Sequence, residues 1–102
     1  MKKLTITGNI VADAKAHQAQ DNQFVTFTVA INVGTKESPK TDWVDVICNK
    51  DEIVNQALEQ ATKGSFVKIE GFPTVSAYID KDGKPQAQQK LYARTLVKYE
   101  KE

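Results

Sequence analysis

The feature that most constrains this chain is a short amphipathic helix placed between two segments of alternating residues. Residues 43–48 alternate between core-facing and outward positions, and an apolar stripe with helical spacing follows over residues 53–61. Residues 63–65, Lys-Gly-Ser, stop a helix and lead directly into the alternating segment 66–71. Because strand, short helix and strand follow one another with little linker between them, the sequence predicts a small β barrel.

Alternation with a period of two marks the other strands as well. The expected strands are residues 4–10, 24–33, 43–48, 66–79 and 88–98. Gly8 is expected to bend the first of them, since glycine inside a strand usually marks a bulge or a sharp bend. Residues 15–23 and 34–40 are expected to be loops, and residues 80–84 to form a hairpin turn around Asp-Gly.

The helix is expected to begin at Asn49, whose side chain would cap it together with Glu52, and to end at Gly64. Five strands with one helix between the third and the fourth predict an all-β chain with the five-stranded Greek-key barrel called the OB-fold. A plain α+β sheet stays open as the alternative. The length of 102 residues predicts a single domain, residues 1–102.

Composition and charge exclude several classes of function for this chain. The net charge is only +1, so binding to a polyanion must be local. Arg94 is the only arginine. Because the bidentate hydrogen bonds that recognise guanine in a duplex are made chiefly by arginine, sequence-specific binding to a duplex is not expected. No apolar run suits a membrane span or a signal peptide, and the single cysteine, Cys48, follows the core alternation. These features predict a cytoplasmic protein with no membrane partner.

Catalysis and metal binding have little support in the sequence. His17 is the only histidine, and no serine or cysteine is signalled as its partner, so a nucleophile and base pair is not expected. One cysteine and one histidine cannot form a closed zinc site, and Asp13, Asp42 and Asp45 are not spaced as a metal cluster. Phosphate-loop and dinucleotide glycine patterns are absent. We therefore expect that the protein is not an enzyme and that it binds no metal, no cofactor and no small-molecule substrate.

An ordered set of short motifs covers nearly the whole chain. The motifs are Gly8-Asn9-Ile10 with Ala12-Asp13, residues 27–32, Thr41-Asp42-Trp43, Lys63-Gly64-Ser65, Ile69-Glu70-Gly71, and Tyr78 before Asp80-Lys81-Asp82-Gly83. Together they resemble the bacterial single-stranded DNA-binding protein family. The resemblance implies an OB-fold that binds single-stranded DNA without sequence preference in replication, repair and recombination. It also implies a homo-oligomer, a tetramer or a dimer, held partly by pairing of first strands through Leu4, Thr5 and Ile6.

The same resemblance implies where the bases would stack. Trp43 matches the stacking tryptophan of the family's third strand, and Tyr78 matches the aromatic residue before the long hairpin. Phe24 and Phe66 also lie in outward phase and are further candidates, either as platforms or as interface residues. Without the resemblance, two explanations of Trp43 would carry about equal weight: a platform for stacked bases, or a half-buried side chain at the barrel rim or in a subunit contact.

Lysines would provide the path for the phosphates. The candidate lysines are Lys36, Lys40, Lys50, Lys81, Lys84 and Lys90. For each of them a solvated surface lysine is the simplest alternative. Tyr92 and Tyr99 are expected to pack against the barrel rather than to carry bases.

The sequence also departs from the family. Asn49 stands where the family has an aromatic residue, residues 34–36 lack a tryptophan, and residues 74–77 lack arginines. Asp45 shares an outward face with Trp43, where a basic residue is usual, and a carboxylate there repels phosphate. We therefore expect binding that is weaker and more sensitive to salt.

The family usually carries a flexible linker and an acidic tail, and neither follows Tyr99 in this sequence, so the expectation is either a short, tailless variant or a chain from which the tail has been removed. Two alternatives stay open beside single-stranded DNA binding. One is a dimeric PriB-type primosomal replication-restart protein, which descends from the same family. The other is an OB-fold protein-interaction module with little affinity for DNA, which the depleted basic and aromatic face would allow.

Overall fold

The computed structural model of the chain describes residues 2–99, apart from the side chains of Ala19 and Ser76. Along the chain the elements are β1 (Leu4–Ile10), β2 (Lys15–Ala19), β3 (Asn22–Asn32), β4 (Thr41–Cys48), α1 (Asp51–Gln60), β5 (Phe66–Ile79) and β6 (Pro85–Tyr99). No helix within the described part is long and apolar enough to cross a bilayer.

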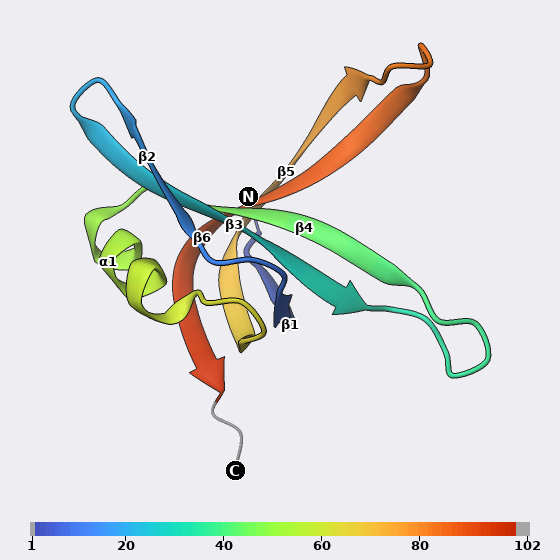
Figure 1. Ribbon diagram of the computed structural model, residues 1–102, viewed down its shortest axis with the longest axis horizontal. Coiled ribbons are helices and arrows are strands. Elements are labelled where there is room, and N and C mark those ends of the chain that lie inside the picture. Colours follow the sequence, from blue (N-terminus) through green and yellow to red (C-terminus); the bar gives the residue numbers. More distant parts are fainter. Residues whose placement is uncertain (1, 100–102) are drawn as a thin grey trace.

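Five of the strands close into a barrel. The sheet order is β1-β5-β6-β4-β3-β2, and an additional pairing of β1 with β3 joins the two sides (Figure 1). The β4–β6 pairing is parallel and the other pairings are antiparallel. This connectivity is that of the OB-fold, so the expectation of a five-stranded barrel with one helix between its third and fourth strands is confirmed.

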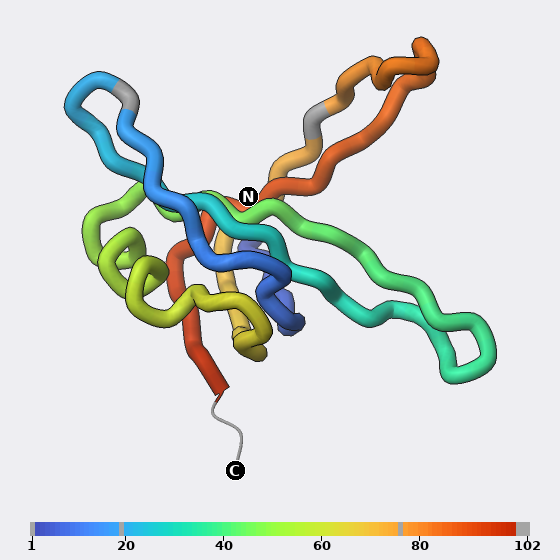
Figure 2. The backbone as a smooth tube through the Cα atoms, in the orientation of Figure 1, coloured from blue at the N-terminus to red at the C-terminus, as the bar shows by residue number. Residues whose placement is uncertain are grey.

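The expected loop over residues 15–23 is wrong, because it contains β2. This strand pairs with the start of β3, from Lys15 opposite Thr26 to Ala19 opposite Asn22. Gln20, with a φ of 55°, lies in the turn between the two strands. The β2–β3 hairpin projects beyond the barrel (Figure 2), and residues 15–18 of β2 are exposed, so they carry no apolar alternation for a sequence reading to detect.

The core lies inside the barrel and under the helix. On β4, for example, Val44, Val46 and Cys48 are buried while the residues between them are not. From α1, Ile53, Val54 and Ala57 are buried, and the helix packs against β3, β4 and β6. The remaining core residues are Ile6, Ile10, Val25, Phe27, Val29, Ala61, Val67, Ile69, Leu91, Ala93 and Leu96.

Both expected ends of the helix are displaced. Lys50, not Asn49, is the N-cap residue, and no side chain caps the helix there. Gln60 is the last helical residue, so the helix ends four positions before Gly64. Gly64 lies instead in the turn that leads into β5, where its N–H donates to the carbonyl of Ile10 at 2.7 Å. This hydrogen bond ties the turn to the end of β1.

Closure of the barrel depends on a close backbone approach at Gly8. β1 pairs with β5 from Leu4 to Asn9, and at Asn9 and Ile10 it pairs with β3. A Cβ atom on Gly8 would lie 2.3 Å from the carbonyl oxygen of Ala30, a distance that no side chain permits. The expected bend in the first strand is therefore the point at which β1 passes from one neighbour to the other.

A bulge in the β5–β6 pairing, whose extra residue is Arg94 of β6, separates the barrel from a projecting arm. The register of β5 and β6 shifts between Glu70 and Gly71, and a Cβ on Gly71 would lie 2.1 Å from the Tyr92 carbonyl oxygen. Beyond this point the two strands continue as a hairpin that leaves the barrel (Figure 1). We call residues 75–89 the arm. Val75 and Ile79 are 67% and 74% exposed because the arm has no core beneath it.

The turn at the tip of the arm is organised by Asp80. Its carboxylate accepts hydrogen bonds from the backbone N–H groups of Asp82 and Lys84 and from the amide of Gln86, each at 2.9 Å. The bond from the Lys84 backbone, followed by that from Gln86, lowers the pKa of Asp80 below its ordinary value of 3.8. The expected hairpin turn is confirmed, and its stability depends on a charged side chain.

Because the carboxylate of Asp80 holds the turn, we expect the stability of the arm tip to depend on pH. A lowered pKa stabilises the turn above pH 3.8, and this stabilisation is lost as the pH falls through the folded-state value. We expect Asp80→Ala to speed hydrogen exchange at the amides of Asp82 and Lys84, and Asp80→Asn to have a smaller effect. Exchange measured by NMR checks this, with Val46 in the core as the unaffected control. Unchanged protection in Asp80→Ala would contradict the assignment.

Cys48 predicts a second pH dependence. Burial raises the pKa of its thiol from 9.0 to about 12, so the folded state favours the neutral thiol. This contribution to stability is complete below pH 9 and is lost as the pH rises from 9 toward 12. We expect the folded protein to resist thiol-specific labelling at neutral pH, and protein unfolded in guanidinium to react fully. Rapid labelling of the folded protein would show that Cys48 is accessible.

Candidate functional site

The outer faces of β3, β4 and β6 form one polar surface. β4 lies between β3 and β6, and the register sets Asp45 beside Thr28 on one side and Lys90 on the other. Because side chains alternate along a strand, the outward residues of β4 follow from its buried ones. Trp43 and Asp45 therefore share this surface, as the sequence predicted.

A hollow of about 480 Å³ lies between β4 and the arm, and we call it the Trp43 hollow. It is lined by Thr41, Asp42, Trp43, Asp45, Tyr78, Ala87, Gln88 and Gln89. Trp43 is 58% exposed and Tyr78 is 52% exposed. The two residues expected to carry bases come from different hairpins, and the fold brings them to one site with their rings accessible.

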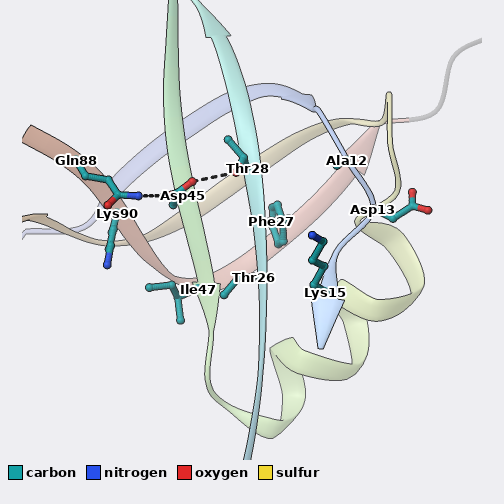
Figure 3. A pocket seen from close by; sticks show the side chains of 10 residues that line it. All are labelled: Ala12, Asp13, Lys15, Thr26, Phe27, Thr28, Asp45, Ile47, Gln88 and Lys90. Carbon is teal, nitrogen blue, oxygen red and sulfur yellow. Dashed lines mark hydrogen bonds between the residues drawn. The ribbon is translucent and has the colours of Figure 1, made fainter. Parts of the chain in front are cut away.

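A second hollow, of about 380 Å³, adjoins the first, and we call it the Lys90 hollow. Its lining is Ala12, Asp13, Lys15, Thr26, Phe27, Thr28, Asp45, Ile47, Gln88 and Lys90 (Figure 3). Asp45 and Gln88 line both hollows, so the two form a continuous depression. Lys15 and Lys90 are the cations that reach it.

Asp45 occupies the junction between the two hollows and is held from both sides. The hydroxyl of Thr28 donates to its Oδ1 at 2.9 Å, and the amide of Gln88 donates to its Oδ2. Figure 3 shows these two donors on either side of the carboxylate. The two hydrogen bonds link β3, β4 and β6 across the outer surface. They also hold the carboxylate of Asp45 at the junction of the two hollows.

The other expected aromatic platforms lie elsewhere. Phe24 stacks on His17 in the β2–β3 hairpin, with ring centroids 4.9 Å apart and an interplanar angle of 17°. Phe66 begins β5, at the opposite end of that strand from the arm, and its ring lies 5.6 Å from that of Tyr99. Neither phenylalanine lines the Trp43 or the Lys90 hollow.

The expected lysines are spread over several sites. Lys36 and Lys40 lie in the β3–β4 loop, and Lys81 and Lys84 lie at the tip of the arm. These two hairpin ends belong to the same hairpins as Trp43 and Tyr78. Lys90 lines its hollow directly. The remaining candidate, the helix N-cap Lys50, follows the end of β4 that is far from Trp43.

Sequence reasoning missed Lys15 and Gln88. Lys15 was assigned to a loop, whereas β2 places it beside Thr26 on the outer surface. The turn residues Asp21-Asn22 before a strong strand were the available signal for a hairpin. Gln88 fell inside an expected strand, but only the pairing of β6 with β4 brings its amide to Asp45.

The residues expected at the oligomer interface differ in accessibility. Leu4 is 44% exposed and Thr5 is exposed, whereas Ile6 is 8% exposed and belongs to the core. Within the described residues, β1 pairs along 4–8 with β5 alone. Its second edge is therefore free over this segment. In a strand pairing at this edge Ile6 would contribute its backbone.

The solved structures similar to this chain share its fold. A Plasmodium falciparum SSB in complex with single-stranded DNA aligns with a TM-score of 0.80 and 17% identity, covering 98% of this chain and 96% of that one. A small single-stranded DNA-binding protein from Streptomyces coelicolor aligns with a TM-score of 0.80 and 16% identity, covering 96% and 94%. At this identity the likeness supports the OB-fold itself.

The sequence comparison agrees with the structural one. The mitochondrial single-stranded DNA-binding protein of Drosophila melanogaster is 27% identical over 99 residues, covering 92% of this chain and 68% of that protein. The model of the Single-strand binding protein family matches residues 1–99. Because this match spans nearly all of the sequence, the chain belongs to the single-strand binding protein family.

Proposed function

We propose that this protein binds single-stranded DNA without sequence preference, by stacking bases on Trp43 and Tyr78 and by contacting phosphates with lysines. The observation that carries the proposal is the Trp43 hollow, in which two exposed aromatic side chains from separate hairpins line one depression. Membership of the single-strand binding protein family supports it independently. The proposed activity is binding alone and includes no catalytic step.

The chemistry of the site suits unpaired bases. An aromatic ring binds the face of any base, and each stacked base contributes roughly 1–3 kcal/mol. A duplex hides these faces, so an exposed Trp43 selects single strands. Lysines act as point charges on phosphates and carry no sequence information. Of the proposed lysines, Lys90 lines the hollow that shares Asp45 and Gln88 with the Trp43 hollow, and those at the two hairpin ends would contact the strand on either side.

Two carboxylates moderate the affinity. Asp42 and Asp45 line the same hollow as the aromatic residues, and the whole chain has a net charge of only +1. Unit charges 4 Å apart in bulk water interact by about 1 kcal/mol, and salt screens that energy. We therefore propose that binding depends on stacking for most of its free energy, with lysine contacts offset in part by these acids.

The oligomeric state is a further part of the proposal. The free edge of β1 supports pairing of first strands between two copies, with Leu4 and Thr5 at the contact and the Ile6 backbone in the ladder. A tetramer would favour ordinary behaviour for the family, and a dimer the PriB-type replication-restart role. Light scattering with and without an oligonucleotide distinguishes them. The cytoplasmic location stays a prediction, since the Drosophila relative is named as mitochondrial.

Titration with oligo-dT tests the proposed function. Trp43 is the only tryptophan, so stacking should quench the intrinsic fluorescence, and added salt should reverse it. Trp43→Ala, measured by anisotropy of a labelled oligonucleotide, should weaken binding by about 1–3 kcal/mol. Tyr99→Ala, an exposed aromatic residue outside both hollows, is the matched control and should bind normally. A flat titration at low salt would favour the protein-interaction module.

Asp45 gives a test with the opposite sign. Asp45→Asn keeps the shape of the side chain and can still accept from Thr28 through Oδ1, while its Nδ2 would donate to the oxygen of a rotated Gln88 amide; the charge is removed, so affinity at low salt should rise by roughly two- to five-fold. Asp45→Lys should raise it further by adding a phosphate contact. The gain should diminish as salt increases. An affinity that is unchanged in both variants would mean that the strand passes elsewhere.

A further inference from the structure

A third hollow, of about 440 Å³, lies on β5 and β6 beside the bulge and shares no lining residue with the other two. We call it the Arg94 hollow; its lining is Phe72, Pro73, Thr74, Tyr92 and Arg94. Phe72 and Tyr92 are directly opposite each other in the β5–β6 register. The guanidinium carbon of Arg94 lies 5.2 Å from the centroid of the Phe72 ring. Two half-buried aromatic side chains and the only arginine of the chain therefore share this hollow.

The Arg94 hollow lies near the Lys90 hollow along β6. Lys90 and Tyr92 are two residues apart on β6, so they point to the same face about 6.8 Å apart, since a strand rises about 3.4 Å per residue. Tyr92 pairs with Ile47, which lines the Lys90 hollow, and Lys90 pairs with Thr74, which lines the Arg94 hollow. β6 thus presents Gln88, Lys90 and Tyr92 in a row that passes all three hollows.

The chemistry of the Arg94 hollow differs from that of the Trp43 hollow. No carboxylate lines it, whereas Asp42 and Asp45 line the other. The guanidinium faces the Phe72 ring, which leaves the N–H groups at its edge free to bind an anion. Within residues 2–99, no carboxylate lies within ion-pair distance of Arg94. A cation beside aromatic faces, without competing negative charge, fits a nucleotide.

We propose that the Arg94 hollow is a second nucleotide subsite, in which a base packs against Tyr92 and Phe72 and Arg94 binds the adjoining phosphate. This subsite rests on the proposed binding of single-stranded DNA and defines the path of the DNA across the protein surface. The DNA runs from the Trp43 hollow along the outer face of β6, past Lys90, to the bulge. The expectation that Tyr92 only packs against the barrel is revised by this proposal.

The test compares Arg94→Gln with Lys98→Ala in the full chain. Glutamine keeps the stem that packs on Phe72 and removes the charge, while Lys98 lies on the same strand beyond the bulge and lines none of the hollows. Binding of labelled oligo-dT is measured over several salt concentrations, with lengths that span the roughly 4–16 nucleotides of an OB-fold site. The readouts are the affinity, its salt slope and the quenching of Trp43 at saturation.

If the subsite exists, Arg94→Gln lowers the slope of log Kobs against log salt by roughly 0.7, the value for one phosphate on a single strand. Affinity falls several-fold for the longer oligonucleotides, and quenching at saturation is unchanged because Trp43 still stacks. Lys98→Ala changes neither measurement. If Arg94→Gln and Lys98→Ala behave alike at every length and salt concentration while the wild type binds, the subsite is wrong and the function stands. If the wild type does not bind, the function itself fails.

A second variant keeps the test decisive if Arg94→Gln does not fold, which circular dichroism would reveal. Thr74 is an exposed residue on the rim of the hollow, and Thr74→Glu places a carboxylate beside the proposed phosphate. Thr74→Glu should lower the affinity for the longer oligonucleotides several-fold. Thr74→Gln, which has the same shape without the charge, should leave that affinity unchanged. Equal affinities of Thr74→Glu and Thr74→Gln would overturn the subsite.

Discussion

Closure of the barrel is the constraint on which the rest of this structure depends. At Gly8 the backbone of β1 comes so close to β3 that only a glycine fits, and at the next residue, Asn9, β1 pairs with both β5 and β3 and completes the ring. Once the ring is closed, each strand segment within the barrel has one face inside and one face outside. The buried Val44 and Val46 then oblige Trp43 and Asp45 to face outward.

The outer surface combines attraction and repulsion at short range. Aromatic rings are exposed at Trp43 and Tyr78, and Asp45 lies between them and Lys90, fixed by hydrogen bonds from two neighbouring strands. A carboxylate held in this way cannot swing away from an approaching phosphate. The surface therefore suits a ligand that brings flat apolar faces into the hollow and keeps its charges at the margins, as an unpaired strand does.

Much of this arrangement could be predicted from the residues. The period of two along residues 43–48 identified both the core of β4 and its outward Trp43, because alternation is a local property of a strand. The strand β2 could not be found in this way, since it projects beyond the barrel and its residues 15–18 are exposed. The helix ends were misplaced by a few residues because the turn into β5 is set by a hydrogen bond to Ile10, far away along the chain.

Local patterns along the chain were enough to predict the buried and outward faces of β4, the approximate place of the helix and the Asp80 turn, because each follows from neighbours a few residues apart. They could not show that the alternating Val75 and Ile79 have no core beneath them. Only the tertiary structure decided which outward residues meet. Trp43 and Tyr78 share a hollow, Gln88 reaches Asp45, and Arg94 covers Phe72 because β6 pairs with β4 and with β5. Such pairings join segments far apart along the chain, and local alternation carries no information about them.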